Sequence, residues 1–298
     1  MERVDIKIGF SCNNRCLFCV QGDKRDFYGF KPKKEVVTFL KYAFKKGKKE
    51  VVFTGGEPCL HPDLLELVQS AKDLGFKEIQ IQTNGRMFAY KDFCVNVIQS
   101  GATQFSPAIH GPNAKIHDFL TNSKGSFDQT IQGVKNLKKL NQYVLTNTVI
   151  TTKNYKHLPK IAKLLVSLGV DQFQFAFIHL GGRAWENRDW IVPKKSQIMS
   201  YVKDGLEIGL KANKRVNTEA IPYCLMEGYE DCIAEKIIPK SMVFDTDFKI
   251  ENYSKYRKYK AKAKGPNCKK CKYNKVCEGP WKEYPELFGW EEFKPVKK

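Results

Sequence analysis

Residues 50–83, with the sequence EVVFTGGEPCLHPDLLELVQSAKDLGFKEIQIQT, hold an apolar run, an amphipathic run and a second apolar run in direct succession. The first run, Glu50 to Thr54, is typical of a short buried strand and ends at two glycines. Leu64 to Leu74 has apolar residues at helical spacing, and Glu78 to Gln82 again predicts a strand. This stretch is therefore a strand–helix–strand unit, which is the building block of a parallel sheet.

The same alternation continues on both sides of this unit. In total the first 180 or so residues predict six strands, each but the last followed by a helix. The pattern predicts an α/β fold, either an open doubly wound sheet or a barrel of βα units. Ligands bind at the carboxyl ends of the strands in both architectures, so the residues after each strand are the candidates for function. The other expected strands are Val4–Phe10, Thr103–Ile109, Tyr143–Ile150 and Gln172–Ile178, and the other expected helices are Lys34–Lys45, Tyr90–Ser100, Phe127–Leu140 and Leu158–Leu168.

The alternation ends near Lys194, where we expect a boundary between a core (residues 1–194) and a second part (residues 195–298). One more helix is expected from Gln197 to Leu210. The rest is an irregular tail, rich in Cys, Lys and Tyr and poor in apolar runs. Such a tail needs a stabilising element other than a large core, for example a bound metal.

Composition excludes several classes of protein. With 298 residues, 42% hydrophobic and 28% charged, the chain is neither disordered nor a disulfide-rich miniprotein. No apolar run reaches the roughly 18 to 20 residues that span a bilayer, and the N-terminus lacks a signal peptide, so we expect a cytoplasmic protein without a membrane partner. Ten cysteines in a reducing compartment indicate metal binding or chemistry more than disulfides. The net charge of +19 is consistent with an anionic partner or with a general preference for lysine.

Three cysteines follow the first predicted strand: Cys12, Cys16 and Cys19 form a C-x3-C-x2-C run. Three thiolates so close together can converge on one metal centre. A structural zinc ion would need a fourth ligand, and this loop contains no His. A [4Fe–4S] cluster held by three cysteines instead leaves one iron open to a substrate or cofactor.

This run resembles the signature of the radical S-adenosylmethionine (SAM) superfamily, C-x3-C-x-aromatic-C, with Phe18 at the aromatic position. A second match is Thr54-Gly55-Gly56-Glu57-Pro58 after the second strand, which resembles the GGE motif of that family. The resemblance implies a partial (β/α)6 barrel in which a [4Fe–4S] cluster binds SAM at its open iron. It also implies that one electron, from a reductant such as flavodoxin or ferredoxin, cleaves SAM to a 5′-deoxyadenosyl radical that abstracts hydrogen from a substrate.

The resemblance further implies which residues contact SAM. Gly55, Gly56 and Glu57 would present backbone groups to its methionine part. Thr83 and Asn84 after the third strand can either contact SAM or form an ordinary turn. Ser106 and Asn147 are possible polar contacts to SAM, although Pro107 departs from the expected strand and Asn147 could be a simple inward-facing amide. His110 and Arg183 are candidates for substrate binding.

A second cysteine group lies near the C-terminus, where Cys268, Cys271 and Cys277 form a C-x2-C-x5-C arrangement. A fourth ligand could be Cys224, which we favour because it follows a proline, or Cys232. The spacing resembles part of the SPASM and Twitch extensions, which bind auxiliary [4Fe–4S] clusters, although Trp281 occupies a position where a full SPASM run has cysteine. We expect one auxiliary cluster, with zinc as the alternative. Cys59 and Cys94 are expected to be buried apolar residues.

Residues 255–275 contain ten Lys or Arg and no acid, with three tyrosines between them. They could bind RNA, or they could compensate an anionic thiolate cluster. The aromatic segment 278–293 is expected to pack over the second metal site or the mouth of the barrel. The sequence therefore predicts an enzyme of the radical SAM type acting on a peptide or protein. The alternatives are an anionic nucleotide, RNA or phosphorylated metabolite as substrate, and a non-catalytic iron–sulfur or zinc protein that binds nucleic acid or senses redox state.

Overall fold

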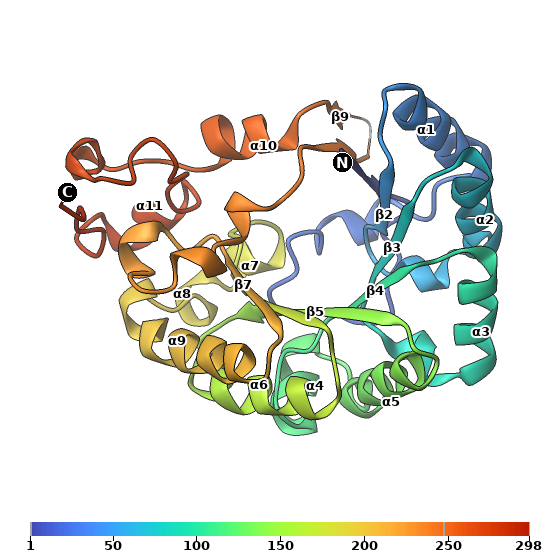
Figure 1. Cartoon of the computed structure of the whole chain (residues 1–298), viewed down its shortest axis with the longest axis horizontal. Coiled ribbons are helices and arrows are strands. Elements are labelled where there is room, and N and C mark those ends of the chain that lie inside the picture. Colours follow the sequence, from blue (N-terminus) through green and yellow to red (C-terminus); the bar gives the residue numbers. More distant parts are fainter. Residues whose placement is uncertain (1, 247, 298) are drawn as a thin grey trace.

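The computed structural model describes residues 2–246 and 248–297, which form an α/β protein around one sheet of nine strands (Figure 1). The strand order is β7-β6-β5-β4-β3-β2-β1-β8-β9. Every neighbouring pair from β7 to β8 is parallel, whereas β9 runs antiparallel to β8. The strands are β1 (Arg3–Lys7), β2 (Glu50–Thr54), β3 (Glu78–Thr83), β4 (Gln104–Pro107), β5 (Tyr143–Ile150), β6 (Gln172–Phe177), β7 (Arg215–Glu219), β8 (Ser241–Phe244) and β9 (Lys249–Ile250).

Helices cover the outer side of the curved sheet (Figure 1). Helix α2 shows why they form: its buried residues Leu64, Leu67, Val68 and Ala71 follow helical spacing, and Gly75 ends it in the left-handed conformation. The longer helices are α1 (Lys33–Lys45), α2 (Leu64–Leu74), α3 (Lys91–Ser100), α4 (Ala114–Thr121), α5 (Ser126–Lys139), α6 (Leu158–Ser167) and α9 (Lys195–Lys211). Short helices are α7 (Arg183–Glu186), α8 (Arg188–Ile191), α10 (Tyr253–Tyr256) and α11 (Tyr284–Phe288).

The two faces of the sheet differ in polarity. Side chains that point toward the helices, such as Val51, Phe53 and Ile81, are completely buried. Their neighbours on the inner face, such as Gln80 and Gln82 of β3, are half-buried or exposed. A closed βα barrel fills its interior with branched apolar side chains. This open sheet instead presents a polar inner face that solvent, and therefore a ligand, can reach.

The predicted fold class is confirmed. Each predicted strand and helix is present, with ends that differ by a few residues at most. The early end of β1 at Lys7 is the largest difference, because Gly9 then forms only an isolated bridge to Phe30.

Several elements were not predicted. Helix α4 follows β4, in a segment for which no helix was predicted. The tail, expected to be irregular, supplies β7 beside β6 and β8 beside β1, with β9 at the edge of the sheet. All three strands are short, and β8 pairs with β1, which is distant in sequence, so local patterns give little sign of them. The division at residue 194 stays a prediction, although β7 and β8 lie in the same sheet as the first six strands.

Across residues 2–246 and 248–297, no helix combines the length and apolar composition that crossing a membrane requires.

Candidate functional site

The cysteine loop, residues 12–19, follows β1 and holds Cys12, Cys16 and Cys19 half-buried. Burial raises the pKa of the Cys12 thiol to about 11, and the nearby Glu57 carboxylate adds to this shift. Burial raises the pKa of Cys16 well above its usual range, and the Cys19 and Cys12 thiols raise it further. Burial also raises the pKa of Cys19. A bound metal cation reverses such shifts and stabilises thiolates, so this donor set fits an iron–sulfur cluster with three protein ligands.

Helix α4 holds one side of the cysteine loop. The Arg15 amide donates a hydrogen bond of 2.9 Å to the Thr121 carbonyl at the end of this helix. The Leu17 amide donates at the same distance to the Leu120 carbonyl. The carbonyl groups at the end of α4 therefore serve as partners for loop amides that would otherwise lack them.

The turn before α7 holds the other side. The Arg183 amide donates to the Cys19 carbonyl at 3.0 Å. Gly182 has a positive φ of 51°, and a Cβ there would lie 2.8 Å from the same carbonyl oxygen. Arg183, expected to bind substrate, thus lies against the cysteine loop beside Cys19.

Gly55 and Gly56 bring the turn after β2 into backbone contact with the chain that leads into the cysteine loop. The Gly56 amide donates to the Gly9 carbonyl at 2.9 Å. A Cβ on Gly55 would lie 2.2 Å from the Gly9 carbonyl oxygen, and a Cβ on Gly56 would lie 2.4 Å from the carbonyl oxygens of Phe10 and Ser11. Both positions therefore require glycine for packing alone.

Glu57 is buried and joins this turn to the end of β3. Its carboxylate accepts hydrogen bonds from the Thr83 hydroxyl (2.6 Å), the Asn84 amide (2.6 Å) and the Cys59 amide (3.0 Å). Burial raises its pKa even though these donors favour the ionised form. The Asn84 side chain in turn donates to Asn13 at 2.6 Å and lies 3.9 Å from the Cys12 sulfur. Glu57, Thr83 and Asn84 therefore form one network that ends on the cysteine loop.

Two arginines at the same place were not predicted from the sequence. The Arg86 guanidinium donates to the Asn13 carbonyl at 2.6 Å and to the Asn14 side chain at 2.9 Å. Arg25 donates to the carbonyls of Cys12 and Asn14, at 2.5 Å each. Both arginines place positive charge beside a loop that would carry three thiolates, and both fix its backbone. One of the two could have been predicted, because Arg86 lies only two residues after the motif residue Asn84.

Phe18 and His110 pack against each other. Their ring centroids are 4.6 Å apart in an edge arrangement, and both side chains are buried. His110 accepts a hydrogen bond from the Val149 amide at 3.3 Å, and burial lowers its pKa well below its usual range. The imidazole is therefore neutral, and it lies behind the aromatic residue of the cysteine motif.

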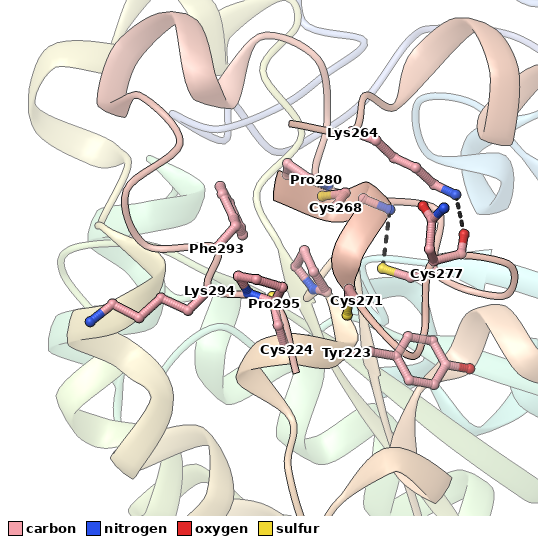
Figure 2. A pocket seen from close by; sticks show the side chains of 13 residues that line it. Tyr223, Cys224, Lys264, Cys268, Cys271, Cys277, Pro280, Phe293, Lys294 and Pro295 are labelled. Atoms are coloured by element: carbon pink, nitrogen blue, oxygen red, sulfur yellow. Dashed lines mark hydrogen bonds between the residues drawn. The ribbon is translucent and has the colours of Figure 1, made fainter. Parts of the chain in front are cut away.

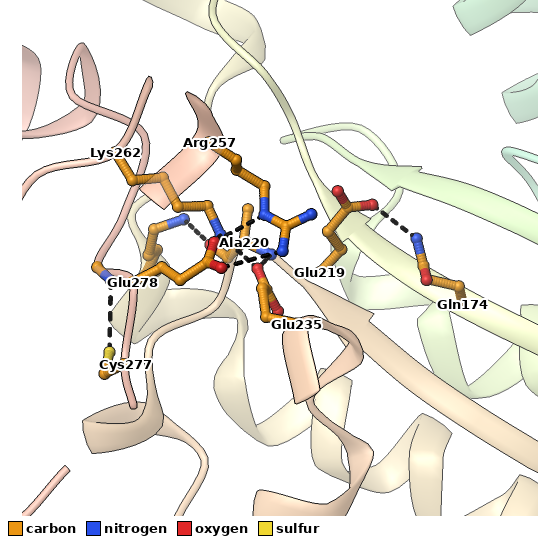
Figure 3. Close-up of polar contacts among 10 residues, drawn as sticks. Gln174, Glu219, Ala220, Glu235, Arg257, Lys262, Cys277 and Glu278 are labelled. Carbon is orange, nitrogen blue, oxygen red and sulfur yellow. Dashed lines mark hydrogen bonds and ion pairs between the residues drawn. The ribbon is translucent and has the colours of Figure 1, made fainter. Parts of the chain in front are cut away.

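On the inner face of the sheet, Ser106 of β4 is buried beside Gln82 of β3. Asn147 of β5 is half-buried beside Gln174 of β6, whose side-chain amide donates to it at 3.5 Å. The same amide donates to the Glu219 carboxylate at 2.8 Å, as Figure 3 shows. Gln174 thus joins Asn147 to Glu219 at the end of β7.

Glu219 was not predicted, and its position is unusually well fixed. The next residue, Ala220, has a positive φ of 59°, a conformation that is rare for residues other than glycine. Its amide donates to Glu235 at 2.8 Å, and its carbonyl accepts from the buried Lys195 ammonium at 2.9 Å. Burial raises the pKa of Glu219, and Glu235 adds to the shift. Backbone strain that neighbouring hydrogen bonds maintain, as at Ala220, is common at functional sites.

The second cysteine group forms a cavity in the tail (Figure 2). Cys224, Cys268, Cys271 and Cys277 line it, all half-buried. Burial raises the pKa of Cys224 to about 12, with Cys277, Cys271 and Cys268 contributing, so the four thiols are electrostatic neighbours. Cys232 is buried and does not line this cavity. Among residues 2–246 and 248–297, no group of three or more His, Cys, Asp or Glu side chains is arranged so that it could hold a metal ion as the side chains stand.

The remaining cysteines behave as expected. Cys59 and Cys94 are buried in the apolar core, at 4% and 0% exposure.

Buried charges lie between this cavity and the sheet (Figure 3). Glu278, which follows Cys277, accepts two hydrogen bonds from Arg257, at 2.7 and 3.0 Å. Lys262 lies 3.3 Å from the same carboxylate and also pairs with Glu235. Two of the ten basic residues in 255–275 are therefore internal and compensated.

The closing aromatic segment packs as predicted. Trp281 is buried and stacks on His179, with ring centroids 4.0 Å apart and an interplanar angle of 12°. Trp290 covers Gly265, where a Cβ would lie 2.5 Å from the indole ring. Phe293 lines the cavity of the second cysteine group.

Comparison with known proteins agrees with this site. The family model described as "Radical SAM superfamily" matches residues 6–165, more than half of the chain. The "Probable GTP 3',8-cyclase" of Saccharolobus solfataricus is 29% identical over 194 residues, which are 63% of this chain and 62% of that protein. The "AdoMet-dependent heme synthase" of Oleidesulfovibrio alaskensis is 28% identical over 58% of this chain and 45% of its own length. The chain thus matches less than two thirds of the length of these relatives.

Solved structures show the same fold. Streptococcus suis SuiB bound to S-adenosylmethionine superposes with a TM-score of 0.68 at 19% identity, over 99% of this chain and 76% of that one. The enzyme anSMEcpe with bound AdoMet and a peptide superposes with a TM-score of 0.68 at 16% identity, over 94% of this chain and 89% of that one. With the family match over the sheet and the cysteine loop, these findings establish that the chain belongs to the radical SAM superfamily, whose members are enzymes that use a [4Fe–4S] cluster and SAM.

Proposed function

We propose that this radical SAM enzyme modifies a peptide or protein and carries a second [4Fe–4S] cluster in a Twitch-like C-terminal region. The observation that carries the proposal is the cavity lined by Cys224, Cys268, Cys271 and Cys277, which come from two separate stretches of the tail. Four thiols around one cavity suit a fully ligated cluster. Cys224 is the fourth ligand in this proposal, and Cys232 has a packing role.

The first cluster is assigned to Cys12, Cys16 and Cys19, and SAM to the polar groups that surround them. When bound, the cluster and SAM supply a 5′-deoxyadenosyl radical that abstracts hydrogen from the substrate. Gly55 and Gly56 leave room for the backbone that leads into the cysteine loop. Glu57 holds Asn84 against that loop.

Phe18, Thr83, Ser106 and Asn147 complete the proposed SAM contacts. In this proposal Phe18 supports the loop from behind, with the neutral His110 ring packed against it. Ser106 and Asn147 lie on the inner face of the sheet, on neighbouring strands β4 and β5.

A peptide substrate is supported by the inner face of the sheet and by the structural neighbours. Gln82, Gln174 and Glu219 offer amide and carboxylate groups that pair well with a peptide backbone. SuiB, of the same fold, has been solved with its precursor peptide SuiA. Arg183 beside the cysteine loop could pair with a carboxylate of the substrate.

A nucleotide is the second candidate substrate. The relatives named as GTP cyclases and the basic stretch 255–275 favour it. A triphosphate would bind through lysine and arginine contacts whose strength falls steeply as salt rises.

The number of clusters is tested on protein purified and reconstituted without oxygen. About eight irons per chain, with sulfide to match, are expected for two [4Fe–4S] clusters. With SAM and a chemical reductant the sample should form 5′-deoxyadenosine. Cys16→Ala should abolish this product, whereas Cys271→Ala should keep it and lose about four irons. Cys232→Ala is the control and should keep all the iron. Full iron content in Cys271→Ala would refute the second cluster.

The substrate is tested by adding either a pool of synthetic peptides or GTP to the loaded enzyme. A peptide that is a substrate should increase the formation of 5′-deoxyadenosine, and the mass of the peptide should change. Stimulation by GTP alone, lost at high salt, would favour the nucleotide.

A further inference from the structure

Eight lysines of the tail form a surface that the proposed chemistry leaves unexplained. None of the eight has a carboxylate within ion-pair distance among the residues that the structure describes, whereas the internal Arg257 and Lys262 do. We call these lysines the basic face. It consists of Lys255, Lys258, Lys260, Lys264, Lys269, Lys270, Lys272 and Lys275, of which Lys258 is half-buried and the others are exposed.

Two segments make up this face and lie side by side. The Lys258 ammonium donates to the Lys275 carbonyl at 3.5 Å, and Lys264 donates to the Asn274 carbonyl. Tyr259 and Val276, one from each segment, are 66% and 57% exposed. Exposed aromatic and apolar groups with a charged rim are typical of a protein-binding surface.

The basic face borders the cavity of the second cysteine group. Lys269 and Lys270 lie between Cys268 and Cys271, and Lys264 lines the cavity itself, as Figure 2 shows. A group held there lies near the surface. The exposed Lys269 and Lys270 separate two of the cysteines in sequence. Because electron transfer slows steeply with distance, a carrier protein docked on the basic face would lie close to a group held by these cysteines.

We propose that the basic face is the docking site of an acidic one-electron carrier protein of the flavodoxin or ferredoxin class. The carrier gives one electron to the cluster held by Cys224, Cys268, Cys271 and Cys277, so the carrier is oxidised and the cluster reduced by one electron. No bond forms or breaks, and no proton needs to move. The inference rests on the proposed second cluster.

Electrostatics support a protein over RNA at this surface. Opposite charges steer two proteins together and raise the rate of encounter, and this effect is lost as salt rises. RNA would also bind lysines, but it would give no reason for the lysines to lie between and around the cluster ligands.

The test mixes a photoreduced bacterial flavodoxin with the oxidised holoenzyme in a stopped-flow instrument and follows bleaching of the clusters. The variant K269E/K270E/K272E should slow the second-order reduction about tenfold or more at low salt. A second variant, K255E/K258E/K260E, lies away from the cysteines and should slow it in the same way. Reduction by photoreduced deazaflavin, a small molecule that needs no docking surface, should change little.

The matched control is K34E/K41E/K45E, which makes the same charge change on the exposed lysines of α1. It should leave reduction by flavodoxin near the wild-type rate. Equal slowing by all three variants would mean a net-charge effect and would overturn docking at the basic face. So would an RNA that co-purifies with the wild type and is lost in the tail variants while their reduction rates stay normal.

Iron counting on the same samples separates the two proposals. A chain that binds only one cluster overturns both the second cluster and the docking. Two clusters whose reduction is indifferent to the lysines overturn the docking alone.

Discussion

Glu57 joins the turn after β2, the end of β3 and the cysteine loop through one buried carboxylate. Replacing it by glutamine, Glu57→Gln, leaves only one acceptor oxygen for the donors Thr83, Asn84 and Cys59. An unsatisfied buried donor costs about 1–3 kcal/mol, so we expect the free energy of unfolding to fall by that amount. Asn84 should then hold Asn13 less firmly, and the protein should retain iron less well. Urea unfolding of the apoprotein and iron retention after gel filtration measure the two effects.

The matched control is Glu66→Gln on α2, where the exposed carboxylate pairs only with the exposed Lys33. Surface pairs of this kind contribute little, so its stability should stay within about 0.5 kcal/mol of wild type. A Glu57→Gln variant as stable as this control would contradict the role given to the carboxylate.

At the same scale, the residue types explain what the sequence could predict. The cysteines and glycines of the site could be predicted because few other residue types do what they do. Few others ligate iron, and a Cβ at Gly55 would lie only 2.2 Å from the Gly9 carbonyl oxygen. Glu219 and Arg86 were missed because glutamate and arginine occur everywhere on a surface. The position of Glu219 is set by the register of β7 on β6 and by the conformation of Ala220, and that of Arg86 by its hydrogen bonds to Asn13 and Asn14. Local sequence reveals none of these.

Among the elements, βα units were predictable from the spacing of their apolar residues. A period of two residues followed by a period near 3.6 can be recognised within a short stretch of sequence. Helix α4 was missed because it is short and lies between two glycine-containing turns. The carbonyl groups at its end nevertheless accept hydrogen bonds from the amides of Arg15 and Leu17. Strand β7 was missed because its sequence, RVNTE, has only one apolar residue, and β8 because its partner β1 is distant in sequence.

Asp118 of α4 links this helix to the start of α5. Its carboxylate accepts from the amides of Gly125 (2.7 Å) and Phe127 (2.7 Å) and from the Ser126 hydroxyl (2.9 Å). Burial alone would raise its pKa, but these hydrogen bonds outweigh burial and lower it. We expect Asp118→Asn to lower the free energy of unfolding by about 1–2 kcal/mol at pH 7.

The pH dependence of this difference follows from the direction of the shift. A carboxyl whose pKa is lower in the folded state stabilises the fold above its unfolded pKa, and the effect is lost as pH falls through the folded pKa. The advantage of wild type over Asp118→Asn should therefore be full at pH 7 and shrink below about pH 4. Urea unfolding of both proteins across this range measures it. A difference that stays constant with pH would show that the charge of Asp118 is not involved.

For the whole molecule, the sheet and the second cysteine group should respond differently to loss of metal. Strands β7 and β8 belong to the tail in sequence, yet they pair with β6 and β1 and do not line the cavity. The segment after residue 262 has little regular structure beyond α11 and is held by packing on Trp281 and by the proposed cluster. Because metal binding is coupled to folding, loss of the cluster should loosen this segment alone.

Hydrogen exchange on the variant Cys268→Ser/Cys271→Ser tests this difference. Amides in 262–297 should exchange about tenfold faster or more, which corresponds to a loss of about 1.4 kcal/mol in the local opening energy. Amides in β1 to β8 should keep their protection, and Cys232→Ala, buried outside the cavity, should exchange like wild type. Faster exchange in β8 and β1 as well would mean that the metal site and the sheet unfold together. The tail would then form one cooperative unit with the core, as its strands form one sheet with it.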